Sequence, residues 1–208
     1  MAGRKLRLRA RAERMAKTRR RIVEAAYDLH CTLGPARTTV SAIAERAGVQ
    51  RHTVYQHFPD DLALFGACTA HGLAIDPPPD PAKVGAIRDP RARLRATLAQ
   101  LYAYYRRNES LLANTARDEP ELVRRVRDAG IDWRDVPETV RRYSELPVAL
   151  RSALVTGWPV RGARRSHLMA ALALALDFGT WSVLTRGSLL EDEQAVELMV
   201  RLVRCAAR

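Results

Sequence analysis

The 208-residue sequence predicts an all-α fold of about nine to ten helices. Apolar residues recur at intervals of three and four along most of the chain, which is the spacing of one face of a helix. Gly and Pro residues interrupt these stretches at intervals that suit helix ends. The sequence contains no alternation of apolar and polar residues that is long enough to predict a β-strand. The apolar residues should therefore be buried between helices.

The composition excludes several classes of protein. An apolar run of about 18 residues is absent, so the sequence predicts no membrane span. The basic N-terminus lacks the apolar segment of a secretory signal. Cys31, Cys68 and Cys205 are far apart and form no C-x-x-C pair, which predicts neither a zinc site nor a disulfide framework. A cytoplasmic location is expected, because a reducing compartment suits free thiols.

Positive charge is concentrated at the N-terminus. Residues 1–21 hold ten Lys or Arg and one acid, Glu13, and so account for nine of the net twelve positive charges. A local basic segment suits nucleic acid first and an anionic membrane surface second. A purely solvating tail is the third possibility. We expect residues 1–19 to form a basic arm that is partly disordered.

Four helices are predicted in residues 20–75. The first ends at Gly34-Pro35, and Thr39 is a suitable N-cap for the second, which ends at Gly48. The third covers about residues 50–58, and the fourth runs from residue 59 to about 72. Residues 20–75 are therefore expected to form one domain.

Five prolines in residues 76–90 predict a linker, because proline cannot continue a helix. We therefore place a domain boundary there and a second, helical domain at 91–208. Its predicted helices are 91–107, 109–117, 119–129, 138–157, 165–186 and 192–206, with breaks at Pro120, Gly130, Pro137, Pro159 and Gly187.

Residues 44–58, AERAGVQRHTVYQHF, have the pattern of a helix-turn-helix. Ala44 is small enough for the second helix to cross closely, Gly48 permits the positive φ of a tight turn, and Val54 fills the space between the helices. The short second helix then protrudes, and a protruding helix fits the major groove of DNA. Its polar side chains are expected to face base edges and phosphates.

The two aromatic residues of this segment have different expected roles. Val54 and Phe58 share a face by their i, i+4 spacing, so Phe58 is assigned to the core. Tyr55 is turned away from that face and is expected at the surface. The histidines have no metal-ligand spacing, and the sequence contains neither a nucleophile elbow nor a Gly-rich phosphate loop.

Residues 38–65, TTVSAIAERAGVQRHTVYQHFPDDLALF, resemble the DNA-binding signature of TetR-type (tetracycline-repressor-like) transcriptional regulators. The likeness extends from about Arg20 to Phe65. It implies an N-terminal three-helix helix-turn-helix domain followed by a helical ligand-binding and dimerisation domain. Beyond residue 80 the chain matches the family only in being helical throughout.

The resemblance also implies residue roles. Thr39 would contact phosphate through its hydroxyl group, and Tyr55 and His57 would contact the DNA backbone. The residues that would face the groove are Gln50, Arg51, His52 and Gln56. The side chains expected to contact DNA are Thr39, Gln50, Arg51, His52, Thr53, Tyr55, Gln56 and His57. One position departs from the family, which usually has a lysine where this chain has Asp61. A carboxylate there does not attract phosphate.

The last two predicted helices are apolar on more than one face, which predicts burial on two sides. One side would pack on the chain's own core and the other on a second copy, because symmetric homodimers are the common oligomers. A single thick monomeric core is the alternative. The expected dimer interface consists of Leu168, Leu172, Ala175, Gly179, Val183, Val196, Met199, Val200 and Val203.

Aromatic and apolar residues of the second domain are candidates for an effector pocket, although each also suits an ordinary helical core. They are Leu98, Leu101, Tyr102, Tyr105, Leu112, Trp133, Tyr143, Trp158 and Phe178. A small apolar or aromatic effector is expected from this composition.

The sequence thus predicts a homodimeric, ligand-responsive DNA-binding regulator. We expect a repressor, but the choice between repressor and activator stays open, because it depends on where the operator lies relative to a promoter. The dimer would bind a pseudo-palindromic operator of double-stranded DNA. No cofactor, metal or membrane partner is expected. Two other interpretations are a helical enzyme that contains a helix-turn-helix and a membrane- or partner-binding protein that uses the basic arm.

Overall fold

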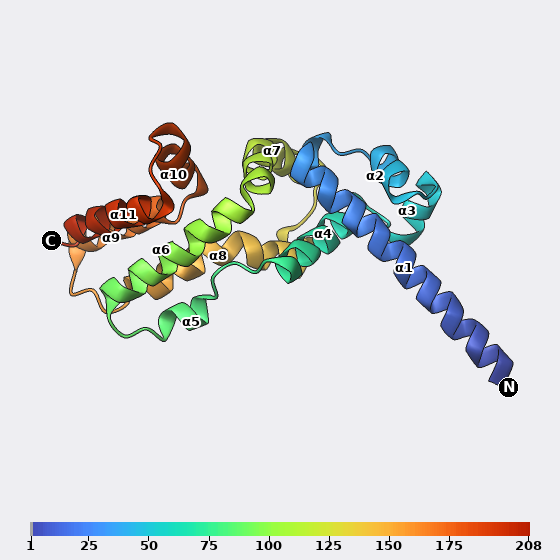
Figure 1. The fold of residues 1–208 in the computed structure, drawn as a ribbon, viewed down its shortest axis with the longest axis horizontal. Helices are drawn as coiled ribbons and strands as arrows, with labels where there is room; N and C mark the ends of the chain where they lie inside the picture. Colours follow the sequence, from blue (N-terminus) through green and yellow to red (C-terminus); the bar gives the residue numbers. More distant parts are fainter. Residues whose placement is uncertain (1) are drawn as a thin grey trace. The chain divides into compact units, whose positions relative to one another are not determined.

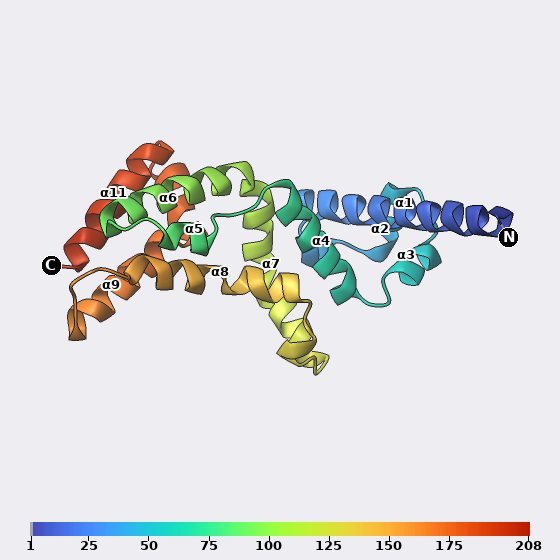
Figure 2. The ribbon, with the colours of Figure 1, turned by 90° about the horizontal axis from the view of Figure 1, so that it is seen from below.

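The computed structural model describes residues 2–208, which are helical with no β-strand (Figures 1 and 2). This confirms the predicted all-α class. The helices are α1 (Ala2–Thr32), α2 (Val40–Ala47), α3 (Arg51–His57), α4 (Asp61–Ile75), α5 (Pro81–Gly85), α6 (Pro90–Arg107), α7 (Glu109–Asp128), α8 (Glu138–Val155), α9 (Gly162–Ala175), α10 (Phe178–Ser182) and α11 (Asp192–Ala206). Short 3-10 turns lie at Pro35–Arg37 and Trp133–Asp135, and a π-helical turn lies at Val183–Gly187.

The chain forms two compact units. The first contains the residues up to Ile75 together with Ser110–Arg141, and the second contains Asp76–Glu109 and Arg142–Arg208. The change of unit after Ile75 coincides with the boundary expected from the prolines. Residues 110–141, however, belong to the first unit, whereas the sequence places them in the domain 91–208. The expected linker at residues 76–90 contains helix α5, which begins at a proline and is capped by Asp80.

Helix α1 includes nearly all of the expected basic arm, of which only Met1 lies outside the described residues. The arm is therefore an extension of a core helix, where the sequence predicts a partly disordered segment. Arg and Ala dominate it, and both residues have high helix propensity. The side chains of residues 4–17 are exposed, so this part of α1 is held only by its continuity with the packed part.

The core of the first unit lies between α1, α2, α3 and α4. Its large side chains with the least exposure are Ile22, Val54 and Phe58. The complete cluster is Ile22, Val23, Ala25, Ala26, Leu29, Ile43, Ala44, Ala47, Val54, Phe58, Leu64 and Cys68. Small residues of both α1 and α2, including Ala26 and Ala44, belong to this cluster and let the two helices approach closely.

Helix α7 is joined to the end of α1 by polar contacts. Asp118 is buried and accepts the Ala36 N–H at 3.0 Å, and Arg117 donates to the same carboxylate at 2.8 Å. The hydrogen bond from Arg117 holds the pKa of Asp118 below its usual value. Asn114 Nδ2 donates to the Cys31 carbonyl at 2.8 Å, so α7 satisfies groups that the end of α1 leaves unpaired.

Two helix boundaries differ from the prediction. Pro120 lies inside α7 and does not break it. Pro120 and Ala116, four residues earlier, are both exposed, so water can solvate the carbonyl that loses its N–H partner. The expected helix 165–186 is interrupted at Asp177, whose carboxylate accepts the Thr180 N–H at 2.6 Å and caps α10. An N-cap restarts a helix without any Gly or Pro.

The second unit is built around α6, α9 and α11. Tyr102 and Tyr105 of α6 donate to the carbonyls of Ala175 and Leu176 at 3.1 and 2.6 Å. These hydroxyls satisfy orphan carbonyls at the C-terminus of α9. The most deeply buried side chains of this core include Leu94, Leu98, Leu150, Leu154, Leu168, Leu172, Trp181 and Val203.

Membrane-spanning potential is limited to one helix pair. Among the described residues, no single helix has the length and apolar character to cross a bilayer. By those two criteria alone, the bent pair Gly162–Ala175 and Phe178–Gly187 together qualifies. Leu168, Leu172 and Trp181 of this pair are buried within the second unit.

The turn at Gly48 generates a stability prediction. Gly48 has a φ of 65°, and an added Cβ would lie 2.7 Å from Arg21 Nη2. The Arg21 guanidinium would have to move away from the added methyl group and give up its hydrogen bonds to the turn. Gly48→Ala should therefore lower the free energy of unfolding by more than the roughly 1–2 kcal/mol expected for left-handed strain alone. Gly130→Ala is the matched control, because Gly130 has the same φ but open space around it. Equal losses in chemical denaturation would show that the contact with Arg21 is unimportant.

His30 generates a pH prediction. Burial beside Phe65 lowers the pKa of His30 from 6.5 to about 4, although the Asp118 carboxylate acts in the opposite direction. The unfolded chain therefore binds a proton between pH 6.5 and 4 that the folded chain does not. The free energy of unfolding should fall by roughly 3 kcal/mol across this window as the pH falls.

Denaturation curves across this pH range measure the effect. His30→Leu should remove most of this pH dependence, and His167→Gln, at an exposed histidine of α9, should retain it. Equal slopes of stability against pH in the two variants would exclude His30 as the cause.

Candidate nucleic-acid interface

Helices α2 and α3 form the helix-turn-helix predicted from the sequence. Thr39 caps α2 by accepting the Ala42 N–H at 3.2 Å, and Gly48 ends it in the left-handed conformation. Arg21 of α1 donates to the carbonyls of Ala47 and Gly48, the second at 3.2 Å. The turn between the two helices is therefore fixed to α1 by backbone acceptors as well as by apolar packing.

Helix α3 has one buried side and one exposed side. Val54 is 1% exposed and Phe58, directly after the helix, is 2% exposed, so these two residues anchor it. Tyr55 is 45% exposed, as its position away from Val54 predicts. Of the eight residues expected to contact DNA, Thr39, Gln50, Arg51, His52, Tyr55 and Gln56 are exposed, and Thr53 and His57 are half-buried. A polar surface is thus presented on a short, firmly held helix.

Arg51 and Tyr55 contact each other on the exposed side of α3. The Arg51 guanidinium donates to the Tyr55 hydroxyl at 3.3 Å and lies 5.8 Å from the ring centroid. Their i, i+4 spacing places them on one face. Gln50 is the N-cap of α3, but its side chain makes no capping hydrogen bond. These groups can therefore donate to or accept from a base edge or a phosphate.

Arg19 contributes to the site, and the sequence analysis does not single it out. Its guanidinium lies over the Phe58 ring, 4.6 Å from the centroid, which is a cation–π contact. Arg21 reaches the turn before α3 and Arg19 reaches the residue after it, so the two arginines connect α1 to both ends of α3. The signal in the sequence is only the cluster of basic residues that precedes Ile22.

Asp60 and Asp61 begin α4 for a local reason. Asp60 Oδ1 accepts the Ala63 N–H at 2.7 Å, and Asp61 is the exposed first residue of the helix. Carboxylates at a helix N-terminus are stabilised by the helix dipole. The acid at position 61 thus favours the helix start, but it also places negative charge where the resemblance implies a phosphate contact.

Comparison with known proteins supports this assignment of the helix-turn-helix. Residues 22–68 match the family described as bacterial regulatory proteins of the tetR family. Residues 22–68 therefore form a DNA-binding domain of the TetR type. The matched residues contain α2, α3 and the packed part of α1, which are the elements that form the polar surface.

Two curated relatives share this TetR-family domain. The regulator SrpR and the uncharacterized regulator TtgW, both of Pseudomonas putida, are each 39% identical over 67 residues. The match covers 31% of this chain, 32% of SrpR and 50% of TtgW, so it spans half or less of either relative. Both are described as HTH-type transcriptional regulators.

Solved structures of transcriptional regulators are similar in fold to most of this chain. NalD of Pseudomonas aeruginosa, the secondary repressor of the MexAB-OprM multidrug efflux pump, has a TM-score of 0.59 at 19% identity. That match covers 93% of this chain and 97% of NalD. A tetR-family regulator of Streptomyces coelicolor has a TM-score of 0.56 at 18% identity, with coverages of 92% and 79%. At these identities the likeness concerns the fold alone.

The expected effector-pocket residues are divided between the two compact units. Leu98, Leu101 and Tyr102 are at most 2% exposed and pack in the core of the second unit, where Tyr105 is also buried. Tyr143, Trp158 and Phe178 are half-buried in the same unit. Leu112 and Trp133 belong to the first unit, and Trp133 is 50% exposed. Four of the nine residues are thus part of the helical core, and an effector pocket formed by this set stays a prediction.

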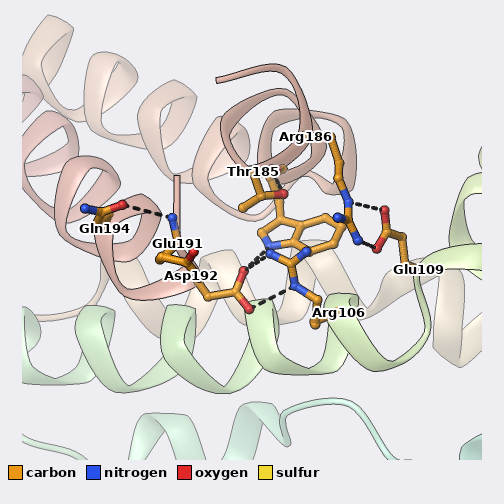
Figure 3. A network of polar contacts seen from close by, with 8 residues as sticks. Arg106, Glu109, Thr185, Arg186, Glu191, Asp192 and Gln194 are labelled. Carbon is orange, nitrogen blue, oxygen red and sulfur yellow. Dashed lines mark hydrogen bonds and ion pairs between the residues drawn. The ribbon is translucent and has the colours of Figure 1, made fainter. Parts of the chain in front are cut away.

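A groove in the second unit is lined by charged residues that the sequence analysis does not single out (Figure 3). Arg106 forms a bidentate contact with Asp192, at 2.7 and 3.2 Å, and its guanidinium lies 4.9 Å from the centroid of the Trp181 ring. Trp181 Nε1 donates to the same carboxylate, and Arg186 pairs with Glu109. The arginine and carboxylate charges of this network are thus matched, which is the pattern of a structural network joining α6, α10 and α11.

Most of the expected dimer-interface residues are core residues. Leu168, Leu172, Ala175, Val196, Met199, Val200 and Val203 are at most 5% exposed within the single chain. They cannot form a surface, because α6 and the facing helices of the second unit already cover them. Gly179 and Val183 are exposed, as are Leu174 and Leu202 at 59% and 49%. The periodic stripe in the sequence identified the inner face of α9 and α11 rather than the outer one.

The described residues contain no group of three or more His, Cys, Asp or Glu side chains placed to hold a metal ion. Cys68 is buried, and burial raises the pKa of its thiol to about 12, so it remains protonated. Its thiol packs in the core and donates to the Val23 carbonyl at 3.8 Å. Cys68 is therefore a residue of the core.

Arg51 and Tyr55 should have separable effects on DNA binding. Arg51→Ala should relax base preference at one operator position by roughly 1–3 kcal/mol, because arginine can form two hydrogen bonds to guanine. Tyr55→Phe keeps the ring under Arg51 and removes only the hydroxyl, so it should weaken all duplexes by a similar factor. Competition binding with single-base operator variants measures both effects. A changed base preference in Tyr55→Phe would show that the roles are assigned wrongly.

Proposed function

We propose that the protein is a homodimeric transcriptional repressor that binds a pseudo-palindromic operator through α3 of each subunit. The observation that carries the proposal is the exposed polar side of α3 within a TetR-family domain. Val54 and Phe58 hold this short helix so that Arg51 and Tyr55 point outward. A helix presented in this way fits the major groove, and its polar groups match base edges and phosphates.

Dimerisation is proposed because two linked recognition helices bind far more tightly than one. Paired half-sites lie about one helical turn apart, roughly 34–36 Å, and a twofold dimer matches this spacing. Leu174, Val183 and Leu202 of the second unit are large apolar residues that a single chain leaves exposed. A second copy covering these residues would remove them from water.

Release by a small molecule is the proposed regulation. NalD, whose fold is similar over most of both chains, is described as a repressor of an efflux pump. An effector must bind the DNA-bound and released conformers with different affinity, because equal affinity shifts no equilibrium. The aromatic content of the second unit favours an apolar or aromatic effector.

Selection of bound sequences from a random duplex library tests this function. We expect the selected sequences to share a pseudo-palindromic consensus. In a gel shift with this duplex, the complex should contain two copies of the chain. Mapping of bound sites in the genome would then identify the regulated promoters. Failure to enrich any sequence, or a complex with a single copy of the chain, would contradict the proposal.

Asp61 generates a prediction about affinity. The TetR family usually has a lysine at this position, so Asp61→Lys should restore a phosphate contact. The slope of log K against log salt should steepen by about one unit for each added contact. Asp135→Lys adds the same charge at an exposed position in a 3-10 turn outside the helix-turn-helix. Equal effects of the two substitutions on the selected duplex would exclude a local contact at position 61.

A further inference from the structure

The buried face of α1 continues into a row of arginines. Ile22, Ala25 and Leu29 face the helix-turn-helix and are buried. Steps of three or four residues toward the N-terminus follow the same face of an α-helix. From Ile22 these steps lead through Thr18 to Arg14, Arg11, Arg7 and Arg4, the last four of which are exposed. We call Arg4, Arg7, Arg11 and Arg14 the arginine row.

Helix α1 is held in a defined orientation relative to α3. Arg19 lies over Phe58 at the end of α3, and Arg21 donates to the carbonyls of the turn before it. The part of α1 that precedes these contacts extends past α2 and α3 in both views (Figures 1 and 2). Residues 4–20 in a helix span about 25 Å. The arginine row therefore lies on the side of α1 that faces α2 and α3, beyond the edge of both helices.

We propose that the arginine row contacts the phosphate backbone of the duplex that α3 binds, next to the half-site read by α3. This inference rests on the proposed function and assigns a second DNA contact to the same domain. None of the four arginines makes an ion pair with a described residue. Guanidinium groups bind phosphate oxygens well and release counterions from the duplex.

An anionic membrane is the main alternative partner for a basic helix. The N-terminal part of α1, however, lacks the distribution of apolar residues that membrane binding requires. Helices that lie in a membrane interface have one continuous apolar face. Leu6 and Leu8 are both exposed, and their spacing of two residues places them on opposite sides of α1. Arg7 and Arg9 adjoin them. The arginine row instead shares a face with the residues that position the recognition helix, which favours DNA.

The chain contains a matched pair of double substitutions. Arg7→Gln with Arg11→Gln removes two charges from the arginine row. Lys5→Gln with Arg9→Gln removes two charges from the other side of the same turns. Both pairs are spaced i, i+4, all four side chains are exposed, and glutamine keeps the helix propensity. Circular dichroism checks that both variants remain folded.

Binding to two DNA probes is measured over a range of salt concentrations. The first probe is the duplex selected by the wild type, extended by about one and a half helical turns on each side. The second is an unrelated duplex of equal length. We expect the Arg7/Arg11 variant to reduce the slope of log K against log salt by about two units. The Lys5/Arg9 variant should reduce it by less than half as much. The Arg7/Arg11 variant should keep the wild-type base preference, since phosphate contacts carry no sequence information.

Equal losses in the two variants would overturn the inference, because the arm would then act only as diffuse charge. No loss in either variant would also overturn it. Binding of the same variants to vesicles containing phosphatidylserine is measured in a parallel experiment. If Arg7 and Arg11 substitution abolished vesicle binding and left DNA binding unchanged, the partner would be a membrane. A wild type that binds neither duplex would refute the proposed function itself, which separates the two failures.

Discussion

The structure of the interface depends on the burial of Val54 and Phe58 beneath α3. A helix of seven residues is too short to be stable in water by itself. Its exposed side is polar and adds little apolar burial. The two anchors, packed on α1 and α2, therefore hold the helix in place and also determine which residues face outward. Because Val54 and Phe58 point inward, Arg51 and Tyr55 point outward, and the polar surface follows from the apolar contact.

Helix α1 combines two roles along one continuous rod. Its C-terminal half contributes Ile22, Ala26 and Leu29 to the core, and its N-terminal half carries exposed arginines. Arg19 and Arg21 lie between these halves and contact the helix-turn-helix directly. A rigid helix transmits the orientation of its packed half to its exposed half. The positive charges of the N-terminal half therefore have a fixed orientation relative to the helix-turn-helix. In a flexible basic tail they would have no fixed orientation.

Polar contacts between segments that are distant in sequence determine which parts of the chain form the first unit. Asp118 and Asn114 of α7 satisfy backbone groups near the end of α1, so a segment that follows α6 in the chain packs with the N-terminal helices. In the second unit, hydroxyls of Tyr102 and Tyr105 satisfy carbonyls at the end of α9. Aromatic residues that could have lined a pocket are instead used to close the core around a helix end.

The sequence by itself determined the helical class, the turn at Gly48, the inward position of Val54 and Phe58 and the type of DNA-binding domain. These features depend on the local spacing of residues and on the backbone freedom of glycine. Both can be recognised within a single short segment of the sequence. Only the tertiary structure decided that α7 joins the first unit and that the stripes of α9 and α11 face inward. A periodic apolar stripe shows that a helix face is buried, but not which partner covers it. Charge density likewise predicted a basic N-terminus, whereas the orientation of this segment depends on the contacts of Arg19 and Arg21, which are made with residues distant in sequence.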